Sequence, residues 1–309
     1  MIPFLNDGFN RQWQNAGSVK SKTLELTLGA NWLTGSDFTW NTNIVFSKIR
    51  QNIEALPIPP YLYDNGNMGD QSLFYVKAGE VYGVMYGYKF VRNLDEMSKQ
   101  LPAGKAITDY IVNSDGYVVP AGSEGKATEL PIRVKENGAD WYGKVGDGNP
   151  DFNMGLSNTI AYKGLSLYFL LDYKKGGDIY NGKDQRLAFN YTSARMDMSN
   201  VDPAKKKTYD YWAVGMYDKN DINAYWVEDG TYLKLRELAL GYSIPSKHLN
   251  KFLKGTFKGV TLKAIGRNLL TFTKYSGYDP EVGSLRMPYD GIYMNPNYRN
   301  IAFSLSFDF

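Results

Sequence analysis

Apolar and polar side chains alternate along several stretches of this chain. The clearest stretch is its end, where apolar residues at positions 301, 303, 305, 307 and 309 are separated by Ala, Ser, Ser and Asp. A period of two places successive side chains on opposite faces of a β-strand. The same alternation predicts seven strands, at residues 24–32, 38–47, 152–163, 165–174, 231–243, 260–272 and 301–309.

The predicted strands are unusually long. At roughly 9 to 13 residues they exceed the common strand length of about 5–6, and they are long enough to cross a bilayer as tilted strands. In residues 231–243 the phase changes between Leu235 and Leu238. A one-residue bulge near Glu237 would reconcile the two halves of this strand.

The links between the predicted strands alternate in length. Links 34–37, 163–164 and 244–259 are short or moderate, whereas 49–150, 175–230 and 273–296, here called the first, second and third long loops, are rich in Gly, Tyr, Asn and Asp. An antiparallel meander places each set at one end of the sheet, which is the asymmetry of an outer-membrane β-barrel. Residues 73–81 and 84–91 predict a further hairpin inside the first long loop. We therefore predict an all-β, up-and-down antiparallel meander of the transmembrane-barrel type.

Composition narrows the possible functions. Aromatic residues make up 15% of the 309 residues, although the mean hydropathy is −0.41. A net charge of +3 gives no support for nucleic-acid binding. The absence of cysteine excludes disulfides and thiolate chemistry. The single histidine, His248, lies in a proline-containing link and is expected at the surface.

No motif predicts catalysis or a metal site. The run from Asp147 to Asp151 resembles the start of a calcium loop, but Phe152 and Asn158 stand where Gly and Glu are needed, so a polar turn is favoured. A triad cannot be built with one histidine. We expect no enzyme activity, no cofactor and no bound metal. Residues 205–207 are three lysines, for which a solvated charge run is the expected role.

The two ends of the chain carry expectations about targeting and insertion. The first residues lack a basic segment followed by an apolar one, and no run of 18 apolar residues occurs, so neither a signal peptide nor a transmembrane helix is predicted. The terminal strand is predicted to be the signal for insertion by the barrel-assembly machinery, rather than a strand that merely ends the chain. Its apolar face is Ile301, Phe303, Leu305, Phe307 and Phe309. Interfacial aromatic girdles are expected near strand ends, at Trp32, Tyr162, Tyr173, Tyr232 and Tyr242.

Several motifs resemble the SusC/RagA family of TonB-linked outer-membrane transporters. The most specific is GRNLLTFTKY at 266–275 followed by GYDPEV at 277–282. The others are at residues 83–89, 145–152, 155–158, 162–164, 226–236 and 240–245, and together they run from about residue 24 to Phe309 in the family's order.

The resemblance implies part of a large outer-membrane barrel of about 22 strands in a Gram-negative type of envelope. It also implies outer-membrane lipid and a SusD-like lipoprotein lid as partners, contact with TonB through an N-terminal plug region, and energised import of oligosaccharides or peptides. The present sequence matches the C-terminal barrel portion and shows no plug region. We expect it to be an incomplete portion that does not transport alone.

Substrate contacts are expected in the long loops. Aromatic side chains that could stack on sugar rings are Trp212, Tyr275, Tyr278, Tyr289 and Tyr293, although packing within the loops is an equal alternative. A soluble extracellular β-sandwich that binds carbohydrate is the second hypothesis, and it predicts loops that are not sorted by length. A β-rich glycan hydrolase is the third; it requires a carboxylate pair across a cleft, which Glu25, Asp172 and Glu237 do not offer.

Overall fold

Seven long strands form one antiparallel sheet in the computed structural model, which describes residue 15 and residues 17–35, 37–63, 73–244, 259–283 and 288–308. The sheet order follows the chain: β1 (Ser18–Thr34), β2 (Phe38–Ala55), β11 (Pro150–Tyr162), β12 (Leu165–Gly176), β15 (Tyr232–Ile244), β16 (Gly259–Thr273) and β17 (Asn300–Asp308). Each strand pairs with the next, and β1 and β17 are the open edges of the sheet. The seven predicted strands and the meander topology are confirmed.

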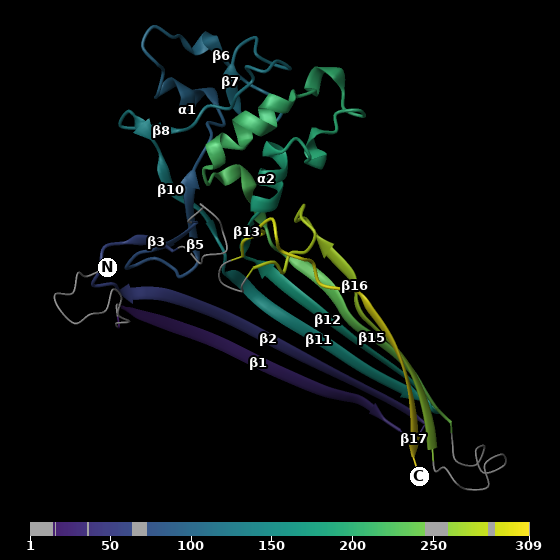
Figure 1. The fold of residues 1–309 in the computed structure, drawn as a ribbon. Helices are drawn as coiled ribbons and strands as arrows, with labels where there is room; N and C mark the ends of the chain where they lie inside the picture. The colour runs from purple at the N-terminus through teal and green to yellow at the C-terminus, as the bar shows by residue number, and fades with distance from the viewer. Residues whose placement is uncertain are drawn as a thin grey trace, which may run out of the picture.

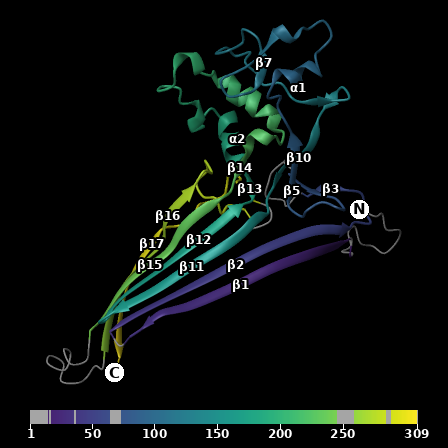
Figure 2. The ribbon, with the colours of Figure 1, turned by 180° about the vertical axis from the view of Figure 1, so that it is seen from behind.

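The described parts of the three long loops lie at one end of this sheet, and the turn from β11 to β12 and the described ends of β1 and β2 that the first turn joins lie at the other (Figures 1 and 2). The predicted sorting of links by length is therefore confirmed. The predicted hairpin in the first long loop exists, because β4 (Phe74–Val76) and β5 (Val84–Tyr88) pair at Phe74 and Met85. It belongs to a separate small sheet, since β2 pairs directly with β11.

The first and second long loops fold into a structured unit above the sheet, here called the loop domain (Figure 1). Its four-stranded sheet has the order β10 (Tyr142–Asp147), β5, β4 and β3 (Tyr61–Tyr63). Short pairs join β6 (Tyr110–Val112) to β7 (Val118–Pro120), β8 (Lys135–Glu136) to β9 (Ala139–Asp140), and β13 (Asp178–Tyr180) to β14 (Val227–Asp229). The helices are α1 (Leu94–Ser98), α2 (Gly182–Phe189), a π-helix at Tyr211–Met216, and 3₁₀ turns at Ile107–Asp109, Ala194–Met196, Pro203–Lys205, Asp218–Asn220 and Ala224–Trp226.

One glycine explains how the two loops fit together. The motif at residues 83–89 contains Gly87, where an added Cβ would lie 2.5 Å from the backbone oxygen of Ile222. Tyr88 donates its backbone N–H to the same oxygen at 2.8 Å. The glycine is therefore required because the second long loop crosses directly over β5.

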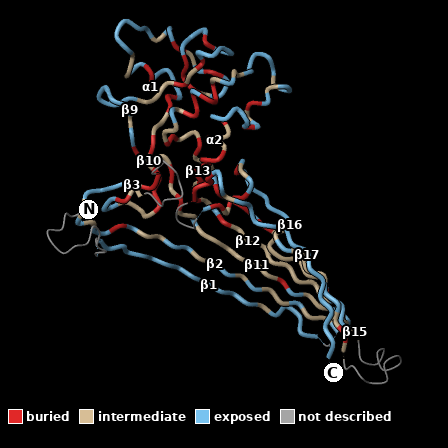
Figure 3. The backbone as a smooth tube through the Cα atoms, viewed as in Figure 1, coloured by how far each residue is buried: buried red, intermediate tan, exposed pale blue. Residues whose placement is uncertain are grey.

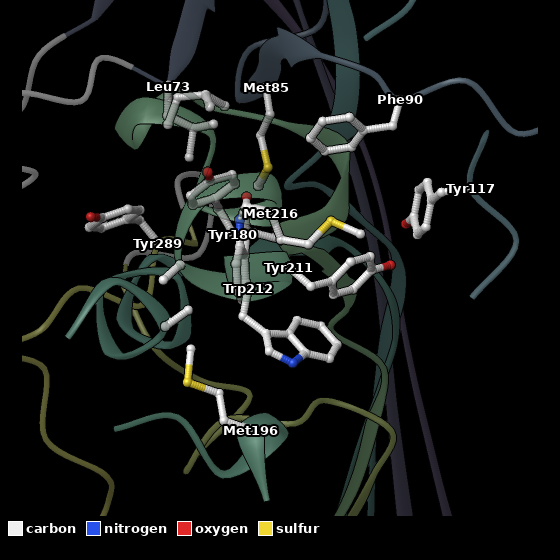
Figure 4. Packing of buried hydrophobic residues seen from close by; sticks show 14 of the residues in the cluster. Leu73, Met85, Phe90, Tyr117, Tyr180, Met196, Tyr211, Trp212, Met216 and Tyr289 are labelled. Atoms are coloured by element: carbon white, nitrogen blue, oxygen red, sulfur yellow. Dashed lines mark hydrogen bonds between the residues drawn. The ribbon is translucent and has the colours of Figure 1, made fainter. Parts of the chain in front are cut away.

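Buried side chains concentrate in the loop domain, whereas the long sheet is mostly exposed or half-buried (Figure 3). The main cluster joins all three long loops: Leu73, Met85, Phe90 and Tyr117 come from the first, Tyr180, Tyr211, Trp212, Met216 and Trp226 from the second, and Tyr289 from the third (Figure 4). No helix among the described residues is long and apolar enough to cross a membrane.

Candidate functional site

The two faces of the seven-stranded sheet differ in chemistry. Cross-strand pairing aligns Leu28, Ile44, Leu156, Leu171, Leu235 and Leu270 in one row across six strands. The neighbouring row, on the opposite face, is Thr27, Val45, Gly155, Asp172, Lys234 and Thr271. The first face is a continuous apolar band. The second, here called the polar wall, carries mostly small, polar or charged side chains.

Two polar side chains interrupt the apolar band, and both are hydrogen-bonded there. Asn158 is buried and pairs across the sheet with Thr42, whose hydroxyl donates to the Asn158 Oδ1 at 2.6 Å. The indole N–H groups of Trp32 and Trp40 donate to Thr42 and Asn158, each at 2.9 Å. Polar groups satisfied in this way can face lipid, where unpaired ones are costly.

The β12–β15–β16 half of the polar wall carries a cluster of paired charges, here called the ion-pair cluster: Asp172, Lys234, Arg236, Asp279 and Glu281. The Lys234 Nζ lies 2.6 Å from both the Asp279 Oδ1 and the Glu281 Oε2. Arg236 bridges Asp172, at 2.5 Å, and Glu281. Because Asp279 and Glu281 belong to the third long loop, the cluster fixes that loop onto the wall.

A bulge in β15 creates this arrangement. Against β12, Leu170 pairs with Glu237 and Leu171 with Leu235, which leaves Arg236 as the extra residue. The extra residue turns both Arg236 and Glu237 toward the polar wall, beside Lys234. The bulge predicted near Glu237 is confirmed, one residue earlier in the chain. Asn268 on the neighbouring β16 has a φ of 52°, a conformation that asparagine tolerates better than most residues.

Glu281 is held ionised by its partners. Burial opposes its negative charge, but hydrogen bonds from Arg236 and Lys234 outweigh burial and lower the pKa of Glu281 to about 2. Tyr232 is buried on the polar wall, and its hydroxyl lies 3.3 Å from Asp172 and 3.2 Å from Glu281. The expectation that Tyr232 belongs to an interfacial girdle is therefore wrong, because its register turns it toward the charged groups.

The β1–β2–β11 half of the polar wall carries a set of neighbouring uncharged amides and hydroxyls. We call this set the amide patch: Asn31, Asn41, Asn43, Ser157 and Thr159. They flank a hollow of about 350 Å³ where Gly29 has no side chain to fill the space. Within the described part of the chain, none of these five side chains has a hydrogen-bond partner. As far as the described residues go, their donors and acceptors are left to water or a ligand.

The five aromatic residues expected to meet substrate fall into two groups. Trp212, Tyr275 and Tyr289 are buried, and Tyr275 donates its hydroxyl to Asp290 at 2.7 Å. Trp212 and Tyr289 belong to the loop-domain core (Figure 4). Tyr278 and Tyr293 are 72% and 92% exposed. The three buried rings pack within the protein, which is the alternative to substrate contact. For Tyr278 and Tyr293, stacking on a substrate stays a prediction.

A buried lysine lies against one of the two exposed tyrosines, Tyr278. Lys183 of α2 lies 3.1 Å from the buried Asp290 and donates to the Met294 backbone oxygen at 2.8 Å. Its Nζ lies 4.7 Å from the centre of the Tyr278 ring. The third long loop is thus held to the loop domain as well as to the wall.

The terminal strand lies at the sheet edge as predicted. Ile301, Phe303, Leu305 and Phe307 are exposed on the apolar face, and Phe309 lies outside the described residues, as does His248. Their role in insertion stays a prediction. The run that resembled a calcium loop forms the turn between β10 and β11, where Asn149 donates to the Tyr82 backbone oxygen at 2.7 Å. Among the described residues, no group of His, Cys, Asp and Glu side chains could hold a metal ion.

Comparisons with known proteins agree with this architecture. No family model matches the chain. It is 28% identical over 280 residues to TonB-dependent receptor P3 of Formosa agariphila, covering 89% of this chain and 26% of the relative. It is 25% identical to the TonB-dependent receptor SusC of Bacteroides thetaiotaomicron, covering 97% of this chain and 27% of that protein.

Solved structures agree as well. A structure of the RagAB peptide importer in the closed-closed state matches with a TM-score of 0.66 and 20% identity, over 97% of this chain and 30% of that chain. The resemblance to TonB-dependent receptors seen in the sequence is confirmed, and the chain has the fold of the barrel part of such proteins. The chain spans between about a quarter and a third of the length of these relatives.

Proposed function

We propose that this chain forms part of the wall of an outer-membrane barrel that imports oligosaccharides or peptides. The observation that carries the proposal is the separation of the seven-stranded sheet into a continuous apolar face and a polar wall. An uncovered apolar face of this extent needs an apolar surrounding, and in a barrel it faces lipid while the other face lines an aqueous path. A soluble β-sandwich would instead bury its apolar faces against each other.

The polar wall supports a transport path rather than a sealed core. In the ion-pair cluster every charged side chain has a partner of opposite sign, and the cluster fixes the third long loop, so its groups are engaged with one another rather than with a solute. The amide patch presents hydrogen-bonding groups that no other described side chain occupies. Weak, neutral hydrogen bonds are suited to a path in which a solute must bind and then leave.

The same proposal predicts the partners of this chain. The long loops would face the outside and meet a SusD-like lipoprotein, and TonB would act through a plug region on the opposite side. The SusC and RagAB relatives support this assignment as similar proteins. The apolar terminal strand would be recognised by the barrel-assembly machinery.

Cysteine labelling tests the orientation of the sheet, because the chain contains no native cysteine. Leu262 and Lys263 are neighbours on β16 with opposite orientations. We use "the full chain" for the complete barrel protein, in which this chain would form one portion of the wall beside the other strands and the plug region. In outer membranes of cells that make the full chain, we expect a hydrophilic maleimide to modify the Lys263→Cys variant and to leave the Leu262→Cys variant unmodified. Equal modification of both, or recovery of the folded chain in the soluble fraction, would contradict the proposal.

Uptake tests the transport itself. Cells that make the full chain are given fluorescent maltoheptaose or a fluorescent peptide mixture, with and without a protonophore that collapses the energy source. Energy-dependent uptake of either probe is expected, and its absence for both would count against import of these two classes.

A further inference from the structure

A groove in the second long loop has the features of a ligand site that neither the strands nor the motifs predicted. It has a volume of about 770 Å³ and lies between residues 191–199 and residues 206–209. Tyr191 and Tyr209 stand at its rim, 59% and 61% exposed. Their rings meet edge to face, with centroids 6.2 Å apart. We call it the tyrosine groove.

The backbone at Tyr191 adopts a conformation that a large side chain disfavours. Tyr191 follows the end of α2 with a φ of 59°. Its N–H donates to the Ala188 oxygen at 3.1 Å, and the Thr192 N–H donates to the Leu187 oxygen at 2.9 Å. These two bonds form the helix-ending turn in which glycine or asparagine is normally found. A large side chain in this conformation is disfavoured, and such exceptions concentrate at functional sites.

Buried contacts hold the residues at the floor of the tyrosine groove. Met196 is buried beneath it, and Ser193 donates to Asp184 at 2.5 Å. On the other side, Lys207 is buried in an ion pair with Glu129. A site that is organised before binding loses less entropy when a ligand is fixed.

The chemistry of the groove favours a neutral, hydroxyl-rich ligand. Among the described lining residues, the charged side chains besides the paired Lys207 are Asp197 and Lys206, one of each sign. Tyrosine rings offer an apolar face with a polar tip. A pyranose has C–H groups on its ring faces and hydroxyls around its edge. The ring faces match the two tyrosines, and the hydroxyls can donate to Thr192 and Ser199, whose own protons go to the Leu187 oxygen and to Asp197. The volume lies within the range of about 300–1,000 Å³ for small-ligand sites.

We propose that the tyrosine groove binds a neutral oligosaccharide by stacking on Tyr191 and Tyr209, and so captures it outside the transport path. The inference rests on the oligosaccharide branch of the proposed function. It adds a capture site within the second long loop, separate from the polar wall.

The position of Tyr191 allows a ring to be removed without damage to the turn. Tyr191→Gly suits the left-handed conformation better than tyrosine does. The test pair is therefore Tyr191→Gly with Tyr209→Ala, which removes both rings, and Tyr191→Phe with Tyr209→Phe, which keeps them. Binding of the purified full chain to maltoheptaose, cellohexaose, xylohexaose and mannohexaose is measured by calorimetry, with a peptide mixture as the counter-probe.

We expect at least one oligosaccharide to bind, the ring-less variant to bind it about tenfold more weakly or worse, and the phenylalanine variant to stay within about threefold of the parent. The proposal is overturned if none of the four binds, if the ring-less variant binds equally well, or if ring removal weakens the peptide mixture alone.

Uptake separates failure of the groove from failure of the transport proposal. In cells, the ring-less variant should raise the half-saturating concentration of the bound oligosaccharide about tenfold and keep the maximal uptake rate. Binding without any uptake by the parent would leave the groove intact and refute transport of that sugar. Uptake with an unchanged half-saturating concentration would refute the groove and leave transport intact.

Discussion

The loop domain has a core of its own, whereas the apolar face of the seven-stranded sheet is uncovered. Among the described residues, the twelve largest fully buried side chains include one from the sheet, Lys234, and eleven from the long loops. On the sheet, Leu28 and Phe303 are 66% and 82% exposed. The loop domain can therefore fold as a water-exposed protein does, while the sheet depends on an apolar surrounding that lies outside the chain.

The largest effect is expected from removing the centre of the loop-domain core. Trp226 is fully buried, and its indole N–H donates to the Met216 oxygen at 2.7 Å. Trp226→Ala should destabilise the loop domain by about 3–5 kcal/mol, through the cavity and the lost contacts. Trypsin added to intact cells should then cleave the long loops much faster, while the sheet stays in the membrane. Val214→Ala, an exposed position nearby, is the control and should cleave at the parent's rate; equal protection of both variants would show that the core does not hold the loops together.

A charge on the apolar face of the sheet should impair insertion into the membrane rather than the packing of the loop domain. Leu240 faces the apolar side and Ala239 the polar wall. Leu240→Lys should cost about 2–4 kcal/mol if the residue lies near the middle of the bilayer. Ala239→Lys adds the same charge one residue away and should be tolerated. The measurement is the amount of each full chain recovered in the outer membrane, and equal recovery would mean that the apolar face does not meet lipid.

The sheet could be predicted from the sequence because its signal is local. Alternation over ten residues shows strand, face and phase together, and Leu235 and Leu238 even revealed the bulge. The loop domain offered no such signal, because its core joins residues far apart in the chain, such as Leu73 and Tyr289. For this reason the sequence leaves substrate contact and loop packing as equal alternatives for Trp212 and Tyr289, which lie in the core.

The ion-pair cluster was within reach of the sequence, although it was not predicted. Lys234 and Arg236 belong to the motif at 226–236, and Asp279 and Glu281 to the motif at 277–282. A spacing of two residues puts Lys234 and Arg236 on the same face of a strand. The second motif offers two carboxylates at the same spacing. What the sequence lacks is the path by which the third long loop returns over the wall.

The ion-pair cluster joins the two regions, and a change there should be intermediate in size. Glu281→Gln removes the charge that Lys234 and Arg236 share and should cost about 1–3 kcal/mol. We expect faster amide hydrogen exchange in residues 275–283 and 288–298 and unchanged exchange in β1 and β2. Unchanged exchange in the third long loop would mean that the cluster does not hold it.

Acid should act on the same contact. The pKa of Glu281 is about 2 in the folded chain, well below the ordinary value of 4.5. A depressed pKa contributes stability above the unfolded value, and that stability is lost as the pH falls from about 4.5 toward about 2. Exchange in the third long loop of the parent should therefore be constant from pH 8 to about pH 5 and rise below that, after correction for intrinsic exchange. The Glu281→Gln variant should lack most of this rise.

The smallest effect is expected at an ion pair that repeats the chemistry of Arg236 without its burial. Arg267 lies 2.8 Å from Glu237 on the same polar wall, but its side chain is 58% exposed, against 21% for Arg236. Water screens the exposed pair, so Arg267→Ala should change stability by about 0–1 kcal/mol. Arg236→Ala should cost about 3–5 kcal/mol, because it leaves Asp172 and Glu281 without their shared partner. Thermal unfolding of the two purified full-length variants, followed by circular dichroism, compares them directly. Equal losses would mean that solvent reaches both pairs to the same degree and that the third long loop does not cover the wall.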